Sequence, residues 1–386
     1  MSTQTPSEAN KMIPAPRHAL ALRSAALVMR GMADLARDSN WLIKKVFTGH
    51  TSNLALSSDG QLCAVLPLVA DDREKVTVFD IELGRPPVAL SVPGERPTGR
   101  SSAPASFVWS STASDLVAAW PGWGNRLYAF DLHQKGRVAG FGEFSRFPTH
   151  LARSESGKYL VSACGGGAEA RLRLWEAAPD SSTGVSFPQL PFREAGDPRT
   201  FEEWFGDRPI DTESTDDSAV SAFGHIAFNP DEGTVASVIE IEGEWADDSI
   251  VLLDVPTLRC VRTFQAKGHI TGLAWTSDSR NLIICSGGQA YRIRPPSSDS
   301  EPLPFGAELV ACHPHLPLCV CFSSWLKSSA KGRLFLVHLD QLLVFDEYAA
   351  DGVSALSWSR DGSKAYAVTA DGLAFIYELP PLWLLA

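Results

Sequence analysis

The sequence predicts an all-β protein in which seven four-stranded sheets form a closed ring. Three observations carry this prediction: a short strand-and-turn motif recurs seven times, further apolar strands follow each copy, and no helical pattern separates the copies. Strands that alternate apolar and polar residues between polar turns are typical of half-buried β-strands. Seven such units in succession predict a seven-bladed β-propeller of four-stranded antiparallel blades.

The recurring motif is an alternating strand that ends in a polar turn. Its copies are NLALSSDG (53–60), FVWSSTASD (107–115), HLARSESG (150–157), HIAFNPDEG (225–233), GLAWTSDS (272–279), LVACHPHLP (309–317) and ALSWSRDG (355–362). A second apolar strand follows each copy directly, and a third follows after a loop, as in KVTVFDI (75–81) and LAFIYEL (373–379). A fourth strand is legible in most units, with VALSV and CVRTF as examples. Two unusually long intervals between copies predict insertions at about 81–105 and 178–222.

One strand has no neighbour in the sequence. WLIKKVFT (41–48) reads as a strand that precedes the first unit, whereas the last unit supplies three strands before the chain ends at PPLWLLA. An unpaired strand edge invites aggregation. Because the two deficits cancel, we predict that the N-terminal strand completes the last blade and closes the ring.

The propeller is expected to span 41–386, after an N-terminal extension of 1–40 with an amphipathic helix at about 18–37. Ala21, Ala25, Val28, Met32 and Leu35 recur at helical spacing in this segment. Arg23 interrupts the apolar run that a secretory signal would need. Three interpretations stay open: a helix that docks on its own domain or on a partner, an organelle transit peptide, or a disordered segment.

Composition bounds the partners and the compartment. The net charge of −11 and the pI of about 5.3 disfavour non-specific binding to nucleic acid or to an anionic membrane. Seven irregularly spaced cysteines, five of them inside apolar runs, indicate buried thiols in a reducing compartment rather than a disulfide framework. We therefore expect a cytoplasmic protein with no nucleic-acid or membrane partner.

Several dipeptides resemble those of the WD40 repeat family. Gly-His precedes a first strand at 49–50 and 268–269, and Asp-Gly forms the turn at 59–60 and 361–362. Phe79-Asp80, Phe130-Asp131, Trp175-Glu176 and Leu253-Asp254 stand where that family places Trp-Asp. The resemblance covers roughly 41–380, although no unit carries a complete Trp-Asp pair, and TolB-like propellers are an alternative relative. It implies a scaffold that binds protein segments near the central opening.

Motifs with catalytic or ligand-binding chemistry are sparse. Cys312-His313-Pro314-His315 superficially resembles a metal cluster, but it falls where every other unit makes its turn, so we predict a turn and no metal. Gly165-Gly166-Gly167 leads into a strand and lacks the helix N-terminus of a phosphate site. The acidic pair Asp247-Asp248 is expected in a solvated loop. No cofactor is predicted.

The tryptophans point to a binding face. Those at 109, 175, 275 and 358 lie on predicted strands, where core packing explains them. Trp120, Trp123, Trp245 and Trp325 are expected in loops between second and third strands, which open on one common face of a propeller. Trp204 and Phe205 lie in the acidic second insertion. These six residues are the candidate partner-binding residues; alternatively, each aromatic side chain folds back on its own blade.

The function expected from the sequence is a non-enzymatic module for protein–protein interaction. One alternative is a propeller enzyme with a metal or substrate in the central channel, for which His50, His150, His225 and His269 precede first strands. Another is a subunit that docks into a larger assembly through the helix at 18–37.

Overall fold

The computed structural model describes most of the chain after residue 40. The described residues are 41–48, 51–67, 75–91, 106–110, 115–120, 126–132, 137–143, 148–164, 171–177, 192–194, 199–200, 220–241, 247–255, 257–295, 297, 300–324 and 332–380. The contacts within the chain divide it into Met1–Asn40 and Trp41–Ala386. The predicted helix at 18–37 therefore lies outside the described residues.

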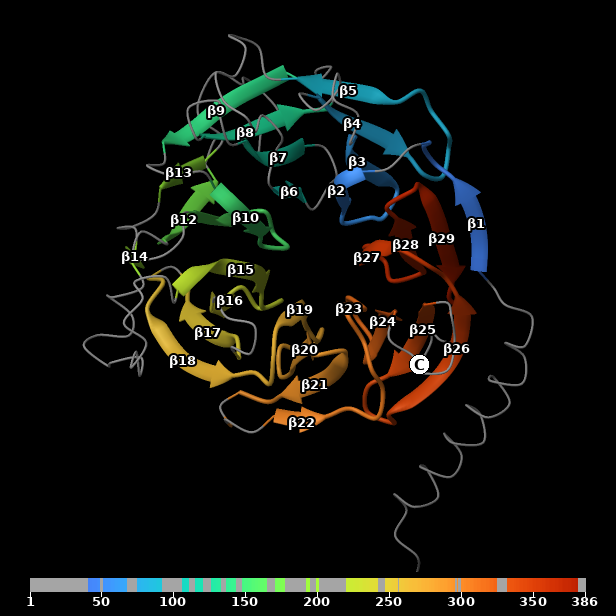
Figure 1. The fold of residues 1–386 in the computed structure, drawn as a ribbon. Coiled ribbons are helices and arrows are strands. Elements are labelled where there is room, and N and C mark those ends of the chain that lie inside the picture. The colour runs from blue at the N-terminus through green and yellow to red at the C-terminus, as the bar shows by residue number, and fades with distance from the viewer. Residues whose placement is uncertain are drawn as a thin grey trace, which may run out of the picture. The chain divides into compact units, whose positions relative to one another are not determined.

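Seven antiparallel sheets follow one another around a ring, as Figure 1 shows. Blade 1 contains β2 (Thr51–Leu56), β3 (Leu62–Pro67), β4 (Lys75–Asp80) and β5 (Val88–Ser91); blade 2 contains β6 (Ser106–Trp109), β7 (Asp115–Trp120), β8 (Arg126–Asp131) and β9 (Arg137–Glu143). Blade 3 contains β10 (Pro148–Arg153), β11 (Tyr159–Cys164), β12 (Arg171–Ala177), β13 (Phe192–Glu194) and the short β14 (Arg199–Thr200).

The remaining blades repeat this order. Blade 4 contains β15 (Val220–Phe228), β16 (Thr234–Ile241), β17 (Ser249–Asp254) and β18 (Cys260–Gln265); blade 5 contains β19 (Ile270–Trp275), β20 (Leu282–Ser286), β21 (Gln289–Ile293) and β22 (Ser300–Pro302). Blade 6 contains β23 (Leu309–Cys312), β24 (Leu318–Ser323), β25 (Arg333–His338) and β26 (Leu343–Ala349). Blade 7 contains β27 (Val353–Trp358), β28 (Lys364–Thr369), β29 (Leu373–Glu378) and β1 (Trp41–Lys45). The predicted seven-bladed fold is confirmed.

The first strand of the chain closes the ring. β1 pairs with β29 in antiparallel register from Trp41↔Tyr377 to Lys45↔Leu373, and it forms the outer edge of blade 7 in Figure 1. The rings of Trp41 and Tyr377 lie 5.1 Å apart. Phe47, which follows β1, is buried with Ile376 of blade 7 and Val65 of blade 1. The predicted closure is therefore confirmed, and it is made by backbone pairing and by apolar packing.

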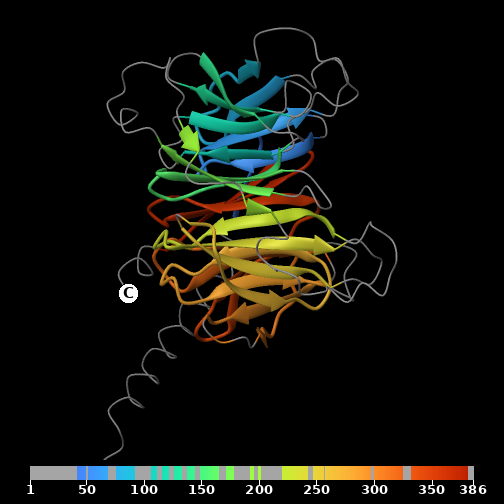
Figure 2. The ribbon, with the colours of Figure 1, turned by 90° about the vertical axis from the view of Figure 1, so that its left-hand side faces the viewer.

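The core lies between neighbouring blades. Apolar side chains from adjacent sheets form continuous buried clusters, for example Phe107 and Leu116 of blade 2 with Val76 of blade 1. The same arrangement recurs at the blade 4–5 seam, where Ile250 packs with Ile284. Figure 2 shows from the side that neighbouring sheets stack against one another. Because described apolar clusters fill the seams 1–2, 2–3, 3–4, 4–5, 5–6 and 7–1, the ring is a well-packed frame for its connections.

A buried polar residue caps every turn between a first and a second strand. The seven caps are Ser57, Ser110, Ser154, Asn229, Thr276, His313 and Ser359, all at most 7% exposed. The cap side chain accepts a backbone N–H in six turns; for example, Ser57 Oγ accepts from Leu62 N at 2.9 Å, and Ser359 Oγ accepts from Lys364 N at 2.8 Å. These bonds satisfy donors that the tight turn would otherwise bury unpaired, which explains the recurring polar residue.

The two predicted insertions contain strands. β5 lies within 81–105 and is the fourth strand of blade 1. β13 and β14 lie within 178–222, and both pair with β12. The second insertion is therefore divided by strand pairing into a segment before β13 and a segment after β14.

Candidate functional site

The connections of the propeller open on two faces. We call the loop face the one that carries the connections from second to third strands and from each blade to the next. The turn face is the opposite one, and it carries the capped turns and the connections from third to fourth strands. This assignment follows from the antiparallel strand order in every blade.

Of the six aromatic residues predicted to bind a partner, the structure describes Trp120. Trp120 is the last residue of β7, where it pairs with Arg126, so its prediction as a loop residue is wrong. The apolar second-strand run LVAAW ends at Trp120, so this residue belongs to the strand and not to the connection. Trp123, Trp245, Trp325, Trp204 and Phe205 lie outside the described residues.

The four tryptophans predicted to lie on strands, at 109, 175, 275 and 358, are structural. The indole Nε1 of Trp109, Trp275 and Trp358 donates to a backbone carbonyl of the preceding blade, namely Ala55 at 3.1 Å, Ala227 at 3.1 Å and Ala311 at 2.9 Å. Trp175 instead donates to Ser162 Oγ of its own blade at 2.8 Å. Buried indoles usually have such a partner, so these four side chains are part of the propeller core.

Two histidines meet at the seam between blades 3 and 4. His150 lies within β10 and His225 within β15, so neither precedes its first strand as predicted. Their rings are 6.0 Å apart, and Nδ1 of His150 is buried without a hydrogen-bond partner. Burial, aided by the neighbouring imidazole, lowers the pKa of His150 to about 4, and burial also lowers the pKa of His225. Both rings are therefore neutral at pH 7.

A third histidine forms an acid–base pair beside them. His269 Nδ1 lies 2.9 Å from Asp248 Oδ2, which also accepts Ile270 N–H at 2.7 Å. Asp248 is 1% exposed, so the prediction of a solvated acidic loop is wrong for this residue. Burial raises the pKa of the nearby Glu240 carboxyl. Titratable side chains of blade 3, blade 4 and the connection to blade 5 therefore lie near one another towards the loop face.

The other chemical motifs are explained by local structure where they are described. His313 Nδ1 accepts the N–H groups of His315 and Leu316, each at 2.9 Å, and its Nε2 lies 3.0 Å from Gly362 O. The predicted turn at 312–315 is confirmed. Within the described ranges, no group of three or more metal-ligating side chains is arranged to hold a metal ion. Gly165–Gly167 lies outside these ranges.

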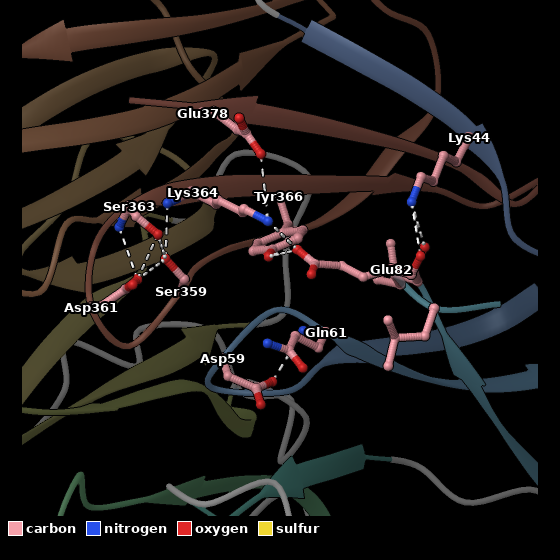
Figure 3. A network of polar contacts seen from close by, with 12 residues as sticks. Lys44, Asp59, Gln61, Glu82, Ser359, Asp361, Ser363, Lys364, Tyr366 and Glu378 are labelled. Carbon is pink, nitrogen blue, oxygen red and sulfur yellow. Dashed lines mark hydrogen bonds and ion pairs between the residues drawn. The ribbon is translucent and has the colours of Figure 1, made fainter. Parts of the chain in front are cut away.

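A polar network occupies the seam where the ring closes, on the turn face (Figure 3). Glu82 Oε1 accepts from Lys364 Nζ and from Tyr366 Oη, each at 2.7 Å, and Lys44 Nζ of β1 donates to Glu82 O at 3.0 Å. The Lys364 ammonium lowers the pKa of the Glu82 carboxyl. A cavity of about 420 Å³ opens beside this network.

Sequence reasoning missed this network. Glu82 and Tyr366 are 284 positions apart, and their contact exists only because the ring closes. A signal was nevertheless present, because Tyr366 stands seven positions after its turn cap, where the other six second strands carry an aliphatic residue.

Comparison with known proteins agrees with the geometry. Residues 258–291, which include Gly268-His269, match the family model "WD domain, G-beta repeat". The chain is a WD40-repeat-like seven-bladed β-propeller. This propeller resembles the β-propeller domain of Cps50 (Swd1) from Myceliophteria thermophila, with 12% identity and a TM-score of 0.57 over 88% of this chain and 100% of that one.

A second solved structure is similar to the same extent. Hydrazine synthase of Kuenenia stuttgartiensis shows 13% identity and a TM-score of 0.59 over 87% of this chain and 97% of that one. At this identity both likenesses concern the fold alone. No curated protein matches the sequence. Among the described residues, no helix is long and apolar enough to cross a membrane.

Proposed function

We propose that this WD40-like propeller is a non-enzymatic interaction module that binds a protein partner through its loop face. The observation that carries the proposal is the contrast between the two faces. The turns between first and second strands are short, capped and hydrogen-bonded from blade to blade, as between Ser58 Oγ and Ser110 O at 3.0 Å. The longest connection, 201–219 after β14, joins strand ends at the loop face, whereas two equally long connections, 92–105 and 178–191, join strand ends at the loop face and at the turn face respectively.

This division is the usual arrangement for binding by loops on a rigid scaffold. WD40 propellers generally mediate protein–protein interaction. The aromatic residues Trp123, Trp245 and Trp325 belong to connections of the loop face in alternate blades. Tryptophans dominate the energetics of many interfaces, so we place the recognition of the partner on these three side chains.

The proposal is tested by removing the three indoles together. A partner is first identified by affinity capture on the wild-type protein and then purified for quantitative binding. The variant Trp123→Ala/Trp245→Ala/Trp325→Ala is expected to bind at least about 30-fold more weakly, since a single interface hot spot contributes about 2 kcal/mol. The matched control is Glu155→Ala/Arg259→Ala/Arg280→Ala, which changes three exposed residues of the turn face.

The two variants separate the faces. The control is expected to bind as the wild type does. Unchanged affinity of a folded triple-tryptophan variant would reject the loop face, and loss of affinity in the control would move the site to the turn face.

A second route of assembly, through the segment at 18–37, is separated by a variant that lacks residues 1–38. The loop-face proposal expects this variant to keep its partner. Loss of the partner with an intact propeller would assign binding to the N-terminal segment instead.

A further inference from the structure

The seam between blades 6 and 7 buries two polar atoms that have no hydrogen-bond partner. Asp346 of β26 is 8% exposed and Trp41 of β1 is 7% exposed, yet Asp346 Oδ2 and Trp41 Nε1 are buried and unpaired. Both residues lie on the outer strands of their blades, and β1 is the strand that closes the ring (Figure 1). A buried polar atom without a partner destabilises the state that buries it.

Tyr377 of β29 links the two unpaired groups. Its ring lies 5.1 Å from the ring of Trp41, and its side chain forms a hydrogen bond with the Asp346 carboxyl. A second contact across the same seam joins the rings of Tyr348 and Phe375, which lie 5.6 Å apart. The Asp346 carboxyl therefore lies between the outer strand of blade 6 and the strand pair β29–β1.

Other buried groups of the same two kinds are paired. Among the described residues, the second buried carboxylate is Asp248, whose Oδ2 accepts the Ile270 N–H at 2.7 Å and lies 2.9 Å from His269 Nδ1. The indoles of the four tryptophans on core strands each donate a hydrogen bond, as described above. Asp346 and Trp41 thus depart from the pattern of their own residue types, and they do so at the strand that closes the ring.

Few charged or titratable groups surround Asp346. Tyr377 faces it from β29, and the adjacent Glu347 adds a negative charge on its own strand. Arg333 of β25 is engaged by Glu347, at 2.9 Å. His338 of β25 is neutral at pH 7, because burial lowers its pKa. None of these groups supplies a positive charge to the Asp346 carboxylate.

The lysines of β1 do not supply one either. Lys44 Nζ donates to the backbone carbonyl of Glu82 in blade 1 at 3.0 Å, and Lys45 Nζ donates to the carbonyl of Asp371 at 2.5 Å. Within the part of the chain that the structure describes, Asp346 has no salt-bridge partner. Burial therefore raises the pKa of the Asp346 carboxyl to about 6.

We propose that β1 is a pH-sensitive latch, whose pairing with β29 opens more often when Asp346 is ionised than when it is protonated. Ionisation places an uncompensated charge in the seam that β1 helps to cover, and opening of β1 returns this carboxylate to water. An open latch also uncovers the edge of β29, which is the kind of edge that accepts a strand from a partner. The latch does not involve the loop face, so each proposal can fail without the other.

The direction and the size of the effect follow from proton linkage. The closed latch binds the Asp346 proton more tightly than the open one, since the pKa of about 6 in the closed state lies above the ordinary value of 3.8. Closure is therefore strongest below the ordinary pKa, and it weakens as the pH rises through 6. Between about pH 7.5 and about pH 5, the equilibrium constant for opening is expected to fall about tenfold.

Hydrogen exchange of the full chain, measured by mass spectrometry at about pH 7.5 and about pH 5, tests the latch. The readout is the protection factor of residues 41–45, which compares the measured exchange with that of an unstructured peptide at the same pH. The wild type is expected to gain about tenfold in protection at the lower pH. β5 is the internal control, because it is the outer strand of blade 1 and no described buried carboxylate lies on it or on its partner β4. Its protection is expected to rise less than about twofold.

A matched pair of variants assigns the effect to one carboxyl group. Asp346→Asn keeps the size of the side chain and removes the ionisable group, so the protection of β1 is expected to rise less than about twofold. The control is Glu347→Gln on the same strand. Glu347 is paired with Phe335, which packs between blades 5 and 6, so the Glu347 side chain faces away from β1. This control is expected to keep the gain of about tenfold.

Each outcome decides the proposal. A gain in the wild type that is lost in Asp346→Asn and kept in Glu347→Gln supports the latch. The proposal is overturned if the wild type gains no protection in β1, if Asp346→Asn gains as much, or if Glu347→Gln also loses the gain. An equal gain in β5 overturns it as well, because the pH would then act on the whole propeller. Since the wild-type protein alone can give a refuting result, misfolding of a variant does not protect the proposal.

Discussion

The histidine pair at the blade 3–4 seam makes the stability of the propeller depend on pH. We consider the variant His150→Phe, which keeps an aromatic ring beside His225 and removes the ionisable group. The folded pKa of His150 is about 4, against an ordinary value of 6.5, because burial disfavours the charged imidazole. The folded state therefore resists protonation that the unfolded state accepts.

The magnitude follows from this difference. Above pH 6.5 such a histidine is neutral in both the folded and the unfolded state, and its titration does not affect stability. As the pH falls from 6.5 towards 4, the unfolded state binds the proton first, so the free energy of unfolding decreases. A difference of about 2.5 pKa units corresponds to about 3 kcal/mol once both states are protonated, and to about 2 kcal/mol at pH 5. At pH 5 the carboxylates that fold with lowered pKa values, such as Asp361, still contribute almost fully.

The assay is urea unfolding of both proteins at pH 7 and pH 5. At pH 7 both rings are uncharged, so the difference between the proteins measures packing alone. From pH 7 to pH 5 the wild type is expected to lose about 2 kcal/mol more than His150→Phe. His225→Phe is expected to act in the same direction, because burial also lowers the pKa of His225. If the free energy of unfolding falls equally in the wild type and in His150→Phe between pH 7 and pH 5, His150 is not buried in its neutral form.

Two further predictions concern the two blades that flank the closing blade, blade 1 and blade 6. Gly60→Ala is expected to reduce the free energy of unfolding by about 3 kcal/mol or more, since Gly60 has φ of 71° and the new Cβ would meet the Tyr366 ring. Gly352→Ala is the control, because Gly352 has a similar φ of 64° but no atom within 4 Å of the new Cβ. It is expected to cost about 1 kcal/mol. Thermal unfolding checks both, and equal costs would contradict the contact with Tyr366. Asp346→Asn is expected to stabilise the protein by about 2–3 kcal/mol at pH 7, because burial raises the Asp346 pKa to about 6 and leaves Oδ2 unpartnered. The cost of burying Asp346 exists only while its carboxyl is ionised, so the stabilisation by Asp346→Asn should disappear by about pH 4. Calorimetry checks this, and a stabilisation that persists at pH 4 would contradict the explanation.

The ring and its closure could be predicted from the sequence because their signals are local and repeated. Each first strand ends in a polar cap and a turn residue such as Asp59 or Gly60, which are chosen by the geometry of a single turn. The extra strand at the N-terminus and the missing strand of the last unit were both visible. Their pairing followed because neither edge is stable alone.

The placement of the histidines could not be predicted, because β-bulges are invisible in an alternating pattern. The β10–β11 register shifts between Pro148 and His150, and the β15–β16 register shifts between Phe223 and Ile226. An extra residue in a strand re-aims the side chains around it. His150 and His225 therefore lie within strands, although their sequence context resembles the Gly-His connection at 268–269.

The closing-seam cavity was beyond sequence reasoning for a different reason. Asp59, Glu82 and Asp361 are ordinary surface carboxylates by pattern, and only the register of ring closure brings them to one cavity. The unusual Tyr366 marked the place, but its partner could not be named before the two ends of the chain were joined.

The central claim is that residues 41–45 close the ring, and hydrogen exchange measured by mass spectrometry tests it most directly. Amides of β1 and of its partner β29 are expected to be protected together, to an extent comparable with the outer strand β5 and its partner β4. Exchange of 41–45 at the rate of an unstructured peptide, with 373–378 still protected, would contradict the closure.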